Sequence, residues 1–144
     1  MTVARRPGER TSDATRKRVA LRLRGTPSSV AKARHLIVGF AREHGFPESE
    51  LFDIDLAVGE ACANAVMHSV TARSTFRVEG SLRADDIVVT VSDSGDDMQP
   101  SMLPDPDRVG GLGLFLIRHL MDQLSLEMSS RGTRLTMSRR RRAA

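Results

Sequence analysis

Three polar residues recur at intervals of four in a stretch that is otherwise small and apolar: Glu60, Asn64 and His68. In a helix this spacing places all three along one face. A carboxylate can act as a general base, and an amide oxygen suits a hard Mg²⁺ ion, but both groups are costly to bury without partners. The spacing therefore predicts either a chemically active helix face or a face that a neighbouring loop satisfies.

A second candidate feature is the run Gly110-Gly111-Leu112-Gly113, which enters a segment with helical periodicity. Glycine weakens a helix, so three glycines in four positions do not serve helix stability. Free amides and the helix dipole at such a start favour a bound phosphate. The spacing matches neither the dinucleotide fingerprint nor the Walker pattern, and a flexible loop-to-helix junction is the alternative interpretation.

Two short polar turns adjoin apolar strands. Asp93-Ser94-Gly95 follows the β-branched run at 87–91, and Gly132-Thr133 precedes the last strand. An aspartate at that point can accept a hydrogen bond from an exocyclic amine, and Gly95 lets the backbone pass close to a ligand. Each turn by itself is also an ordinary chain reversal.

The elements that must position these residues follow from hydrophobic periodicity. In chain order they are a strand at 19–23, a helix between Pro27 and Gly45, a helix from Pro47 to about Ser69, strands at 76–80 and 87–91, a helix at 111–124, a strand at 126–128 and a strand at 134–138. The run at 87–91 predicts a buried central strand, and 92–111 predicts a long loop. This order predicts an α+β two-layer sandwich, with the helices on one face of a mixed, mainly antiparallel sheet.

Composition limits the classes of protein. A length of 144 residues indicates one domain, and a single cysteine excludes an internal disulfide. No apolar run is long enough to cross a bilayer and no secretory signal is recognisable, so no membrane partner and a cytoplasmic location are expected.

The net charge of +4 is unevenly distributed, since basic ends flank an acidic middle. Residues 1–18 are expected to form a disordered basic arm, 19–138 the folded domain and 139–144 a basic tail. Basic ends bind nucleic acid or acidic partners, or are simply solvated. Direct nucleic-acid binding is disfavoured, because the middle is acidic and aromatic residues are few.

Taken as a set, these motifs resemble the nucleotide-binding boxes of the GHKL ATPase superfamily, which includes gyrase, histidine kinases and MutL. The segment 56–68 resembles the N-box, 91–95 the first glycine box, 110–116 the second, and Gly132-Thr133 the last. The resemblance covers about residues 19–138. The stand-alone form, with Gly-Glu-Ala-Cys-Ala-Asn-Ala-Val-Met-His at 59–68, most resembles the anti-sigma factors of the RsbW/SpoIIAB type.

This resemblance implies a Bergerat-type fold that uses ATP and Mg²⁺. It implies a serine/threonine protein kinase that sequesters a sigma factor and phosphorylates a STAS-domain anti-anti-sigma antagonist, and members commonly form homodimers. Many superfamily members carry Asp-x-Gly-x-Gly, whereas Asp96 and Asp97 follow Gly95 here. The alternative is therefore a nucleotide-binding anti-sigma or switch protein without kinase activity.

The resemblance also assigns roles to individual residues. Glu60 is expected to be the general base, and Asn64 to coordinate Mg²⁺. Asp93 is expected to accept from the adenine amino group, with Gly95 beside the ring and Thr133 supporting that contact. The remaining expected nucleotide contacts are the amides of Gly111 and Gly113, their neighbours Gly110 and Leu112 in the same box, and Arg108 at the terminal phosphate.

Overall fold

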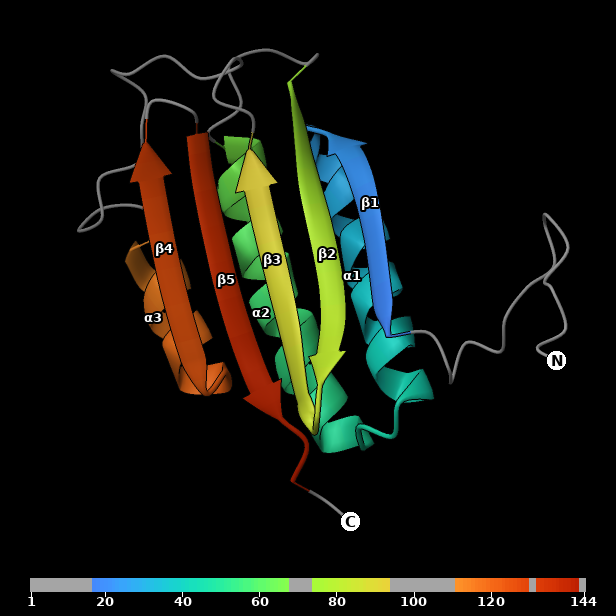
Figure 1. Cartoon of the computed structure of the whole chain (residues 1–144). Coiled ribbons are helices and arrows are strands. Elements are labelled where there is room, and N and C mark those ends of the chain that lie inside the picture. The colour runs from blue at the N-terminus through green and yellow to red at the C-terminus, as the bar shows by residue number, and fades with distance from the viewer. Residues whose placement is uncertain (1–16, 68–73, 94–110, 130–131, 143–144) are drawn as a thin grey trace, which may run out of the picture.

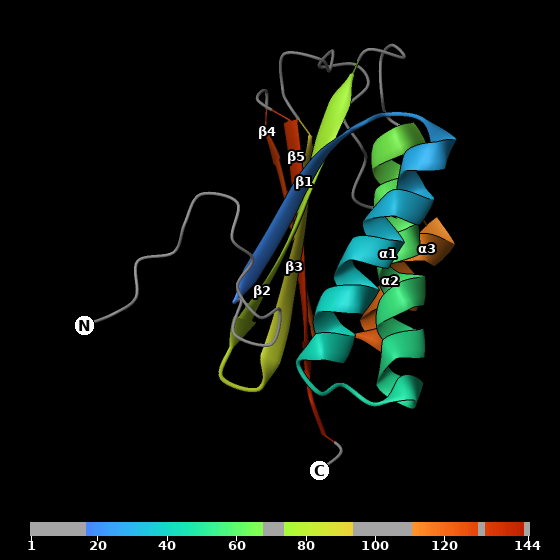
Figure 2. The same cartoon turned by 90° about the vertical axis from the view of Figure 1, so that its right-hand side faces the viewer.

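The computed structural model describes residues 17–67, 74–93, 111–129 and 132–142. Its elements, in chain order, are β1 (Arg18–Arg24), α1 (Pro27–Glu43), α2 (Glu48–Met67), β2 (Thr75–Arg83), β3 (Asp86–Asp93), α3 (Gly111–Leu120), β4 (Gln123–Ser129) and β5 (Gly132–Arg140). Figure 1 shows the sheet in front of the helices, and Figure 2 shows the three helices packed on one side of it. The predicted two-layer α+β sandwich is confirmed.

The described strands form one sheet in the order β1-β2-β3-β5-β4. All four neighbouring pairs are antiparallel, so this sheet is antiparallel throughout rather than mixed. The chain leaves β3 at the centre of the sheet, forms α3 and returns as β4 at the edge, and β5 then fills the position between them. This crossover brings the end of β3 beside the start of β5.

The core lies between the helices and the facing side of the sheet. Alternate residues of β3 are buried there, namely Ile87, Val89 and Val91, whereas Val88 and Thr90 are only partly buried. The prediction of a buried central strand is correct for the position of β3, but only one face of it is covered. The reason is that no described helix packs on the second face of the sheet, which suits an antiparallel sheet.

The two long helices begin and end at residues whose conformation suits these positions. Thr26 is extended before α1, and Pro27 occupies the first helical position, where a missing N–H costs nothing. Gly45 ends α1 with φ of 89°, a value that glycine adopts without strain. Glu48 and Glu50 lie in the first turn of α2, where the helix dipole favours negative charge.

The helix predicted at 111–124 is too long. α3 ends at Leu120, and Leu124 lies in β4 opposite Met137 of β5. Spacing by four favours a helix through Leu124, but Leu124, Leu126 and Met128 also alternate with period two. Pairing with β5 satisfies the backbone of this segment, so the strand pattern prevails.

The boundary expected after residue 138 lies inside β5, which continues through Arg140. Arg139, Arg140, Arg141 and Arg142 each form an ion pair with an aspartate of the folded domain. These four residues, predicted to belong to a basic tail, are therefore part of the sandwich. The arm expected at 1–18 lies outside the described residues up to residue 16, and Arg18 already belongs to β1.

Candidate functional site

Four elements that carry predicted site residues converge at one end of the sandwich. The C-terminal half of α2, the end of β3, the start of α3 and the start of β5 all lie in the upper half of the molecule in Figure 1. They carry Glu60 and Asn64, Asp93, Gly113, and Thr133, respectively. The fold thus brings residues that are up to 73 positions apart in the sequence to the same end of the sandwich.

Glu60, Asn64 and Gly113 form the contact between α2 and α3. A Cβ atom built on Gly113 would lie 3.7 Å from Oε2 of Glu60 and 3.7 Å from Nδ2 of Asn64. The spacing of four residues places both polar side chains on one face of α2, and the packing of the helices directs that face toward the first turn of α3. The glycine keeps the helix start close to them while leaving room beside the backbone.

Asn64 is buried, and its Nδ2 atom has no hydrogen-bond partner among the described residues. Leaving a buried donor unpaired costs about 1–3 kcal/mol, so such a group in a native protein calls for an explanation. A polar ligand that meets the carboxamide is one. The assignment of O and N in a carboxamide follows the hydrogen-bond network, so the oxygen can face such a ligand as readily as the nitrogen. The residues present thus fit a Mg²⁺-bound phosphate group at this position.

Asp93 and Thr133 lie side by side at the end of the pairing between β3 and β5, one residue beyond the pair Ser92–Arg134. Both follow the alternation of the helix-facing side of the sheet. They line one groove of about 460 Å³, together with Ser92, Gly132 and Arg134 among others. The first glycine box and the last box, which are far apart in the sequence, therefore share a cavity wall.

The Asp93 carboxylate also acts on α2. Burial, with a smaller contribution from the negative charge of Asp93, raises the pKa of the Cys62 thiol to about 12. Cys62 is fully buried in the core, so it is a neutral thiol and not a nucleophile. Because the charge of Asp93 acts on the thiol of Cys62, the Asp93 carboxylate lies close to α2, the helix that carries Glu60 and Asn64.

Some predicted site residues cannot be located. Gly95, Arg108 and Gly110 lie outside the described residues. Gly111 and Leu112 are placed only as the first two residues of α3. The expected roles of these five residues stay predictions.

Arg139 is not among the predicted site residues, because the run of four arginines predicts a tail at this position. Its side chain extends under α2 and α3 and donates to Asp53 and to the carbonyl oxygen of Leu120. The sequence contains an indication of its inward position, because Arg139 continues the alternation of Leu135 and Met137 on the helix-facing side of the sheet. The three arginines that follow obscure this alternation.

The chain is similar to several known proteins. A family model described as histidine kinase-like ATPase domain matches residues 23–139. The chain is 32% identical over 127 residues to a serine-protein kinase RsbW from Bacillus licheniformis, covering 78% of this chain and 79% of the relative. It is 30% identical over 128 residues to the serine-protein kinase RsbW of Bacillus subtilis, with the same coverage of 78% and 79%.

Two solved structures share the fold. The crystal structure of the RsbU and RsbW domains of a Mycobacterium tuberculosis protein superposes with a TM-score of 0.70 at 22% identity. That match covers 90% of this chain and 34% of the other, so this chain spans about a third of that protein. The histidine kinase domain of a blue-light activated histidine kinase from Erythrobacter litoralis gives a TM-score of 0.54 at 22% identity, covering 80% of this chain and 59% of that one.

Proposed function

The chain belongs to the histidine kinase-like ATPase domain family, and from this premise we propose that it is an ATP- and Mg²⁺-dependent serine/threonine protein kinase that also acts as an anti-sigma factor. The resemblance to RsbW-type proteins that the motifs predicted is confirmed by curated relatives of that name at 29–32% identity. The observation that carries the proposal is the convergence of Glu60, Asn64 and Gly113, where the buried amide of Asn64 has no hydrogen-bond partner within the described part of the chain.

In this proposal one group of described residues contacts the adenine of ATP, and a second group contacts its phosphates and Mg²⁺. Asp93 accepts a hydrogen bond from the adenine amino group, and Thr133 supports that contact from the adjacent strand. Asn64 would hold a Mg²⁺ ion, which would neutralise phosphate charge, while the amides of Gly111 and Gly113 would donate to phosphate oxygens. The nucleotide supplies the phosphoryl group, and catalysis then depends on positioning and on charge neutralisation.

Glu60 serves as the general base in this proposal. It lies one helical turn before Asn64 and faces the same helix start, so it reaches a hydroxyl group held beside the terminal phosphate. Its carboxylate takes the proton of a seryl or threonyl side chain as the hydroxyl oxygen bonds to the terminal phosphorus, while the bond from that phosphorus to the ADP oxygen breaks and ADP leaves. Gly95, Gly110, Leu112 and Arg108 are proposed to complete the nucleotide contacts.

The proposed partners are proteins. The sequestered partner is proposed to be a sigma factor and the phosphorylated one a STAS-domain antagonist, in the bacterial cytoplasm, with the kinase acting as a homodimer. The support for this is the similarity to bacterial relatives named serine-protein kinase RsbW. None of the described helices is long and apolar enough to span a membrane.

A nucleotide-binding switch without kinase activity is the second candidate. The observation that favours it is the sequence after Gly95, where Asp96 and Asp97 replace the usual x-Gly. Two carboxylates next to a triphosphate repel it.

One experiment separates the two candidates. Phosphate transfer from labelled ATP to a cognate STAS-domain protein is measured beside equilibrium ATP binding for the wild type, Glu60→Gln and Asn64→Ala. We expect Glu60→Gln to reduce transfer by about 10²–10⁴-fold with little change in ATP affinity, because it removes the proton acceptor and keeps the shape. Asn64→Ala should lower Mg²⁺-dependent ATP affinity as well.

The control is Glu48→Gln, at an exposed carboxylate in the first turn of the same helix. It should transfer phosphate at the wild-type rate. Unchanged transfer by Glu60→Gln would remove Glu60 from the base role. ATP binding by the wild type without transfer to any cognate partner would favour the switch.

A further inference from the structure

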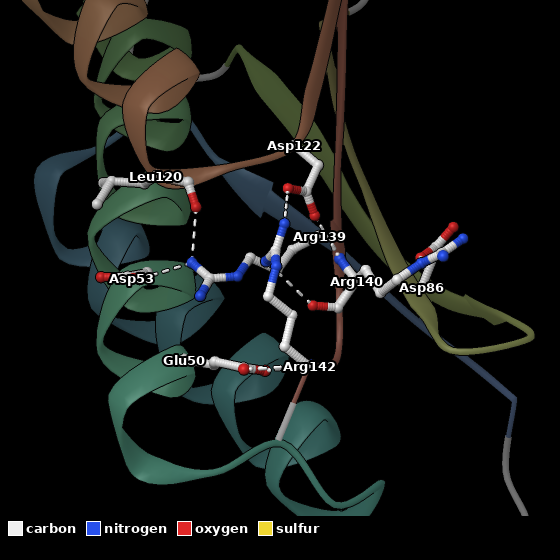
Figure 3. A network of polar contacts seen from close by, with 8 residues as sticks. All are labelled: Glu50, Asp53, Asp86, Leu120, Asp122, Arg139, Arg140 and Arg142. Atoms are coloured by element: carbon white, nitrogen blue, oxygen red, sulfur yellow. Dashed lines mark hydrogen bonds and ion pairs between the residues drawn. The ribbon is translucent and has the colours of Figure 1, made fainter. Parts of the chain in front are cut away.

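The arginines at the C-terminal end of β5 form ion pairs and hydrogen bonds at the end of the sandwich opposite the candidate site. Figure 3 shows three of them, Arg139, Arg140 and Arg142. Arg140 pairs with Asp86 at the start of β3, and Arg141 donates to the carbonyl oxygen of His44 after α1. Arg142 pairs with Asp122, and its backbone N–H lies 3.2 Å from the Glu50 carboxylate of α2. Together these arginines connect the end of β5 to the start of β3, to the end of α1, to α2 and to the residue before β4.

Arg139 differs from the other three in its burial and its partners. Its side chain is 12% exposed, whereas those of Arg140, Arg141 and Arg142 are 69%, 37% and 54% exposed. One atom, Nη1, donates to Oδ2 of Asp53 at 2.6 Å and to the carbonyl oxygen of Leu120 at 2.7 Å. Figure 3 shows the guanidinium group between the two partners.

These two partners belong to the two helices that form the candidate site. Asp53 lies two turns before Glu60 in α2, and Leu120 is the last residue of α3, whose first turn contains Gly113. A ten-residue helix is about 15 Å long, so Arg139 acts at the far end of α3 from the site. A cation at this C-terminus also interacts favourably with the helix dipole.

The environment of Arg139 is not one that stability alone favours. Its Nε atom is buried without a hydrogen-bond partner among the described residues, and its cross-strand neighbour is the buried Ile87. The Asp53 side chain is 30% exposed, so water can solvate its carboxylate if Arg139 is replaced, and replacing both partners of an ion pair in the interior by apolar side chains is often neutral or stabilising. The contribution of Arg139 is therefore geometric, because it links α2 and α3 at defined points.

We propose that Arg139 is a positioning residue for the nucleotide site. By joining Asp53 to the last carbonyl of α3 it sets the spacing of the two helices, and hence the distance of Gly113 from Glu60 and Asn64 at their other ends. The effect on nucleotide binding rests on the function proposed above, whereas the effect on the order of α3 does not.

The test compares Arg139→Met, Arg139→Lys and the control Arg140→Ala. Three quantities are measured: the urea midpoint of unfolding, the dissociation constant of Mg²⁺-ATP and the hydrogen exchange of the α3 amides. Arg139→Met should remain folded, weaken ATP binding about tenfold, within the range for residues that act through packed elements, and speed exchange in α3. Arg139→Lys retains a donor cation and should restore ATP affinity and α3 exchange to near the wild-type values. Arg140→Ala should leave the ATP affinity and the α3 exchange unchanged.

Each contrary outcome has a defined meaning. Wild-type affinity and wild-type exchange in Arg139→Met would overturn the proposal, as would equal losses in Arg139→Met and Arg140→Ala. If Arg139→Met fails to fold, Asp53→Ala carries the same test, since it removes the acceptor of α2 and leaves Arg139 in place; wild-type exchange of α3 in that variant would overturn the proposal. If the wild type binds no ATP, the proposed function fails, and the exchange comparison still decides the role of Arg139.

Discussion

Gly113 of α3 lies against the carboxamide of Asn64 of α2: a Cβ atom at Gly113 would be 3.7 Å from Nδ2 and 3.9 Å from Oδ1. Both values are ordinary contact distances, so a methyl group fits there without displacing Asn64. A larger side chain would have to extend into the space that the two polar groups line. The role of Gly113 is therefore to keep the space beside the start of α3 open. An unusual backbone conformation is not the reason for the glycine, because its φ lies outside the left-handed region.

This contact predicts different results for two substitutions at Gly113. Gly113→Ala should raise the stability of α3 by up to about 1 kcal/mol through helix propensity and retain ATP binding. Gly113→Val adds two methyl groups toward Asn64 and Glu60 and should lose ATP binding with the fold intact. Thermal unfolding and ATP titration of both variants provide the check, and ATP binding by folded Gly113→Val would contradict the phosphate-binding role.

Asp93→Asn should weaken ATP binding by about 1–3 kcal/mol, because an acceptor facing the adenine amino group gains a donor. The substitution keeps the size of the side chain, so the groove shared with Thr133 should keep its shape. ATP affinity is measured by titration, with Asp86→Asn at the opposite end of β3 as the control. Equal affinities in Asp93→Asn and the wild type would remove Asp93 from the nucleotide site.

The ion pair between Arg34 and Asp55 should make the contact of α1 with α2 sensitive to acid. Nε and Nη2 of Arg34 donate to the two carboxylate oxygens at 2.7 and 3.0 Å. The hydrogen bonds from Arg34 lower the pKa of Asp55 against the opposing effect of burial, and the charges of Arg34 and His35 add to the lowering. The stabilisation is therefore present above the unfolded-state pKa of Asp55, and it is lost as the pH falls through the lower folded-state value.

Asp55→Asn should cost about 0.2–1 kcal/mol at pH 7, the range for a partly exposed pair, and this cost should shrink below about pH 4. Urea unfolding of both proteins at pH 7 and pH 3 measures it. Glu48→Gln breaks a more exposed and longer contact with Arg42 and should cost little at either pH. An equal cost of Asp55→Asn at both pH values would show that the charge is not responsible.

Cys62 should be unreactive in the folded protein. Burial raises the pKa of its thiol to about 12, and only the thiolate is an effective nucleophile. Since the folded-state pKa exceeds the unfolded-state value, this group favours unfolding progressively as the pH rises above about 8.5. Labelling with a thiol reagent at pH 8, with and without urea, is the measurement; fast labelling of the native protein would contradict the buried position.

Local sequence determined much of this fold. The period of 3.6 in α1 and α2 and the period of two in β2 and β3 depend on neighbouring residues, so they are readable without the structure. The same holds for Glu60 and Asn64, because their shared helix face follows from a spacing of four residues. That these two would meet Gly113 was expected only from the resemblance, since nothing local links α2 to α3.

Tertiary structure decided the features whose causes are distant in the sequence. The segment after Leu120 fits a helix or a strand by its own pattern, and pairing with β5 made it β4. Arg139 resembles its charged neighbours in the sequence, but its aspartate partner lies 86 residues away. A run of four arginines indicates solvated charge when only local pattern is considered. Only the fold brings carboxylates and the C-terminus of a helix within hydrogen-bonding distance of these arginines. The basic run therefore connects the strands to the helices instead of being solvated.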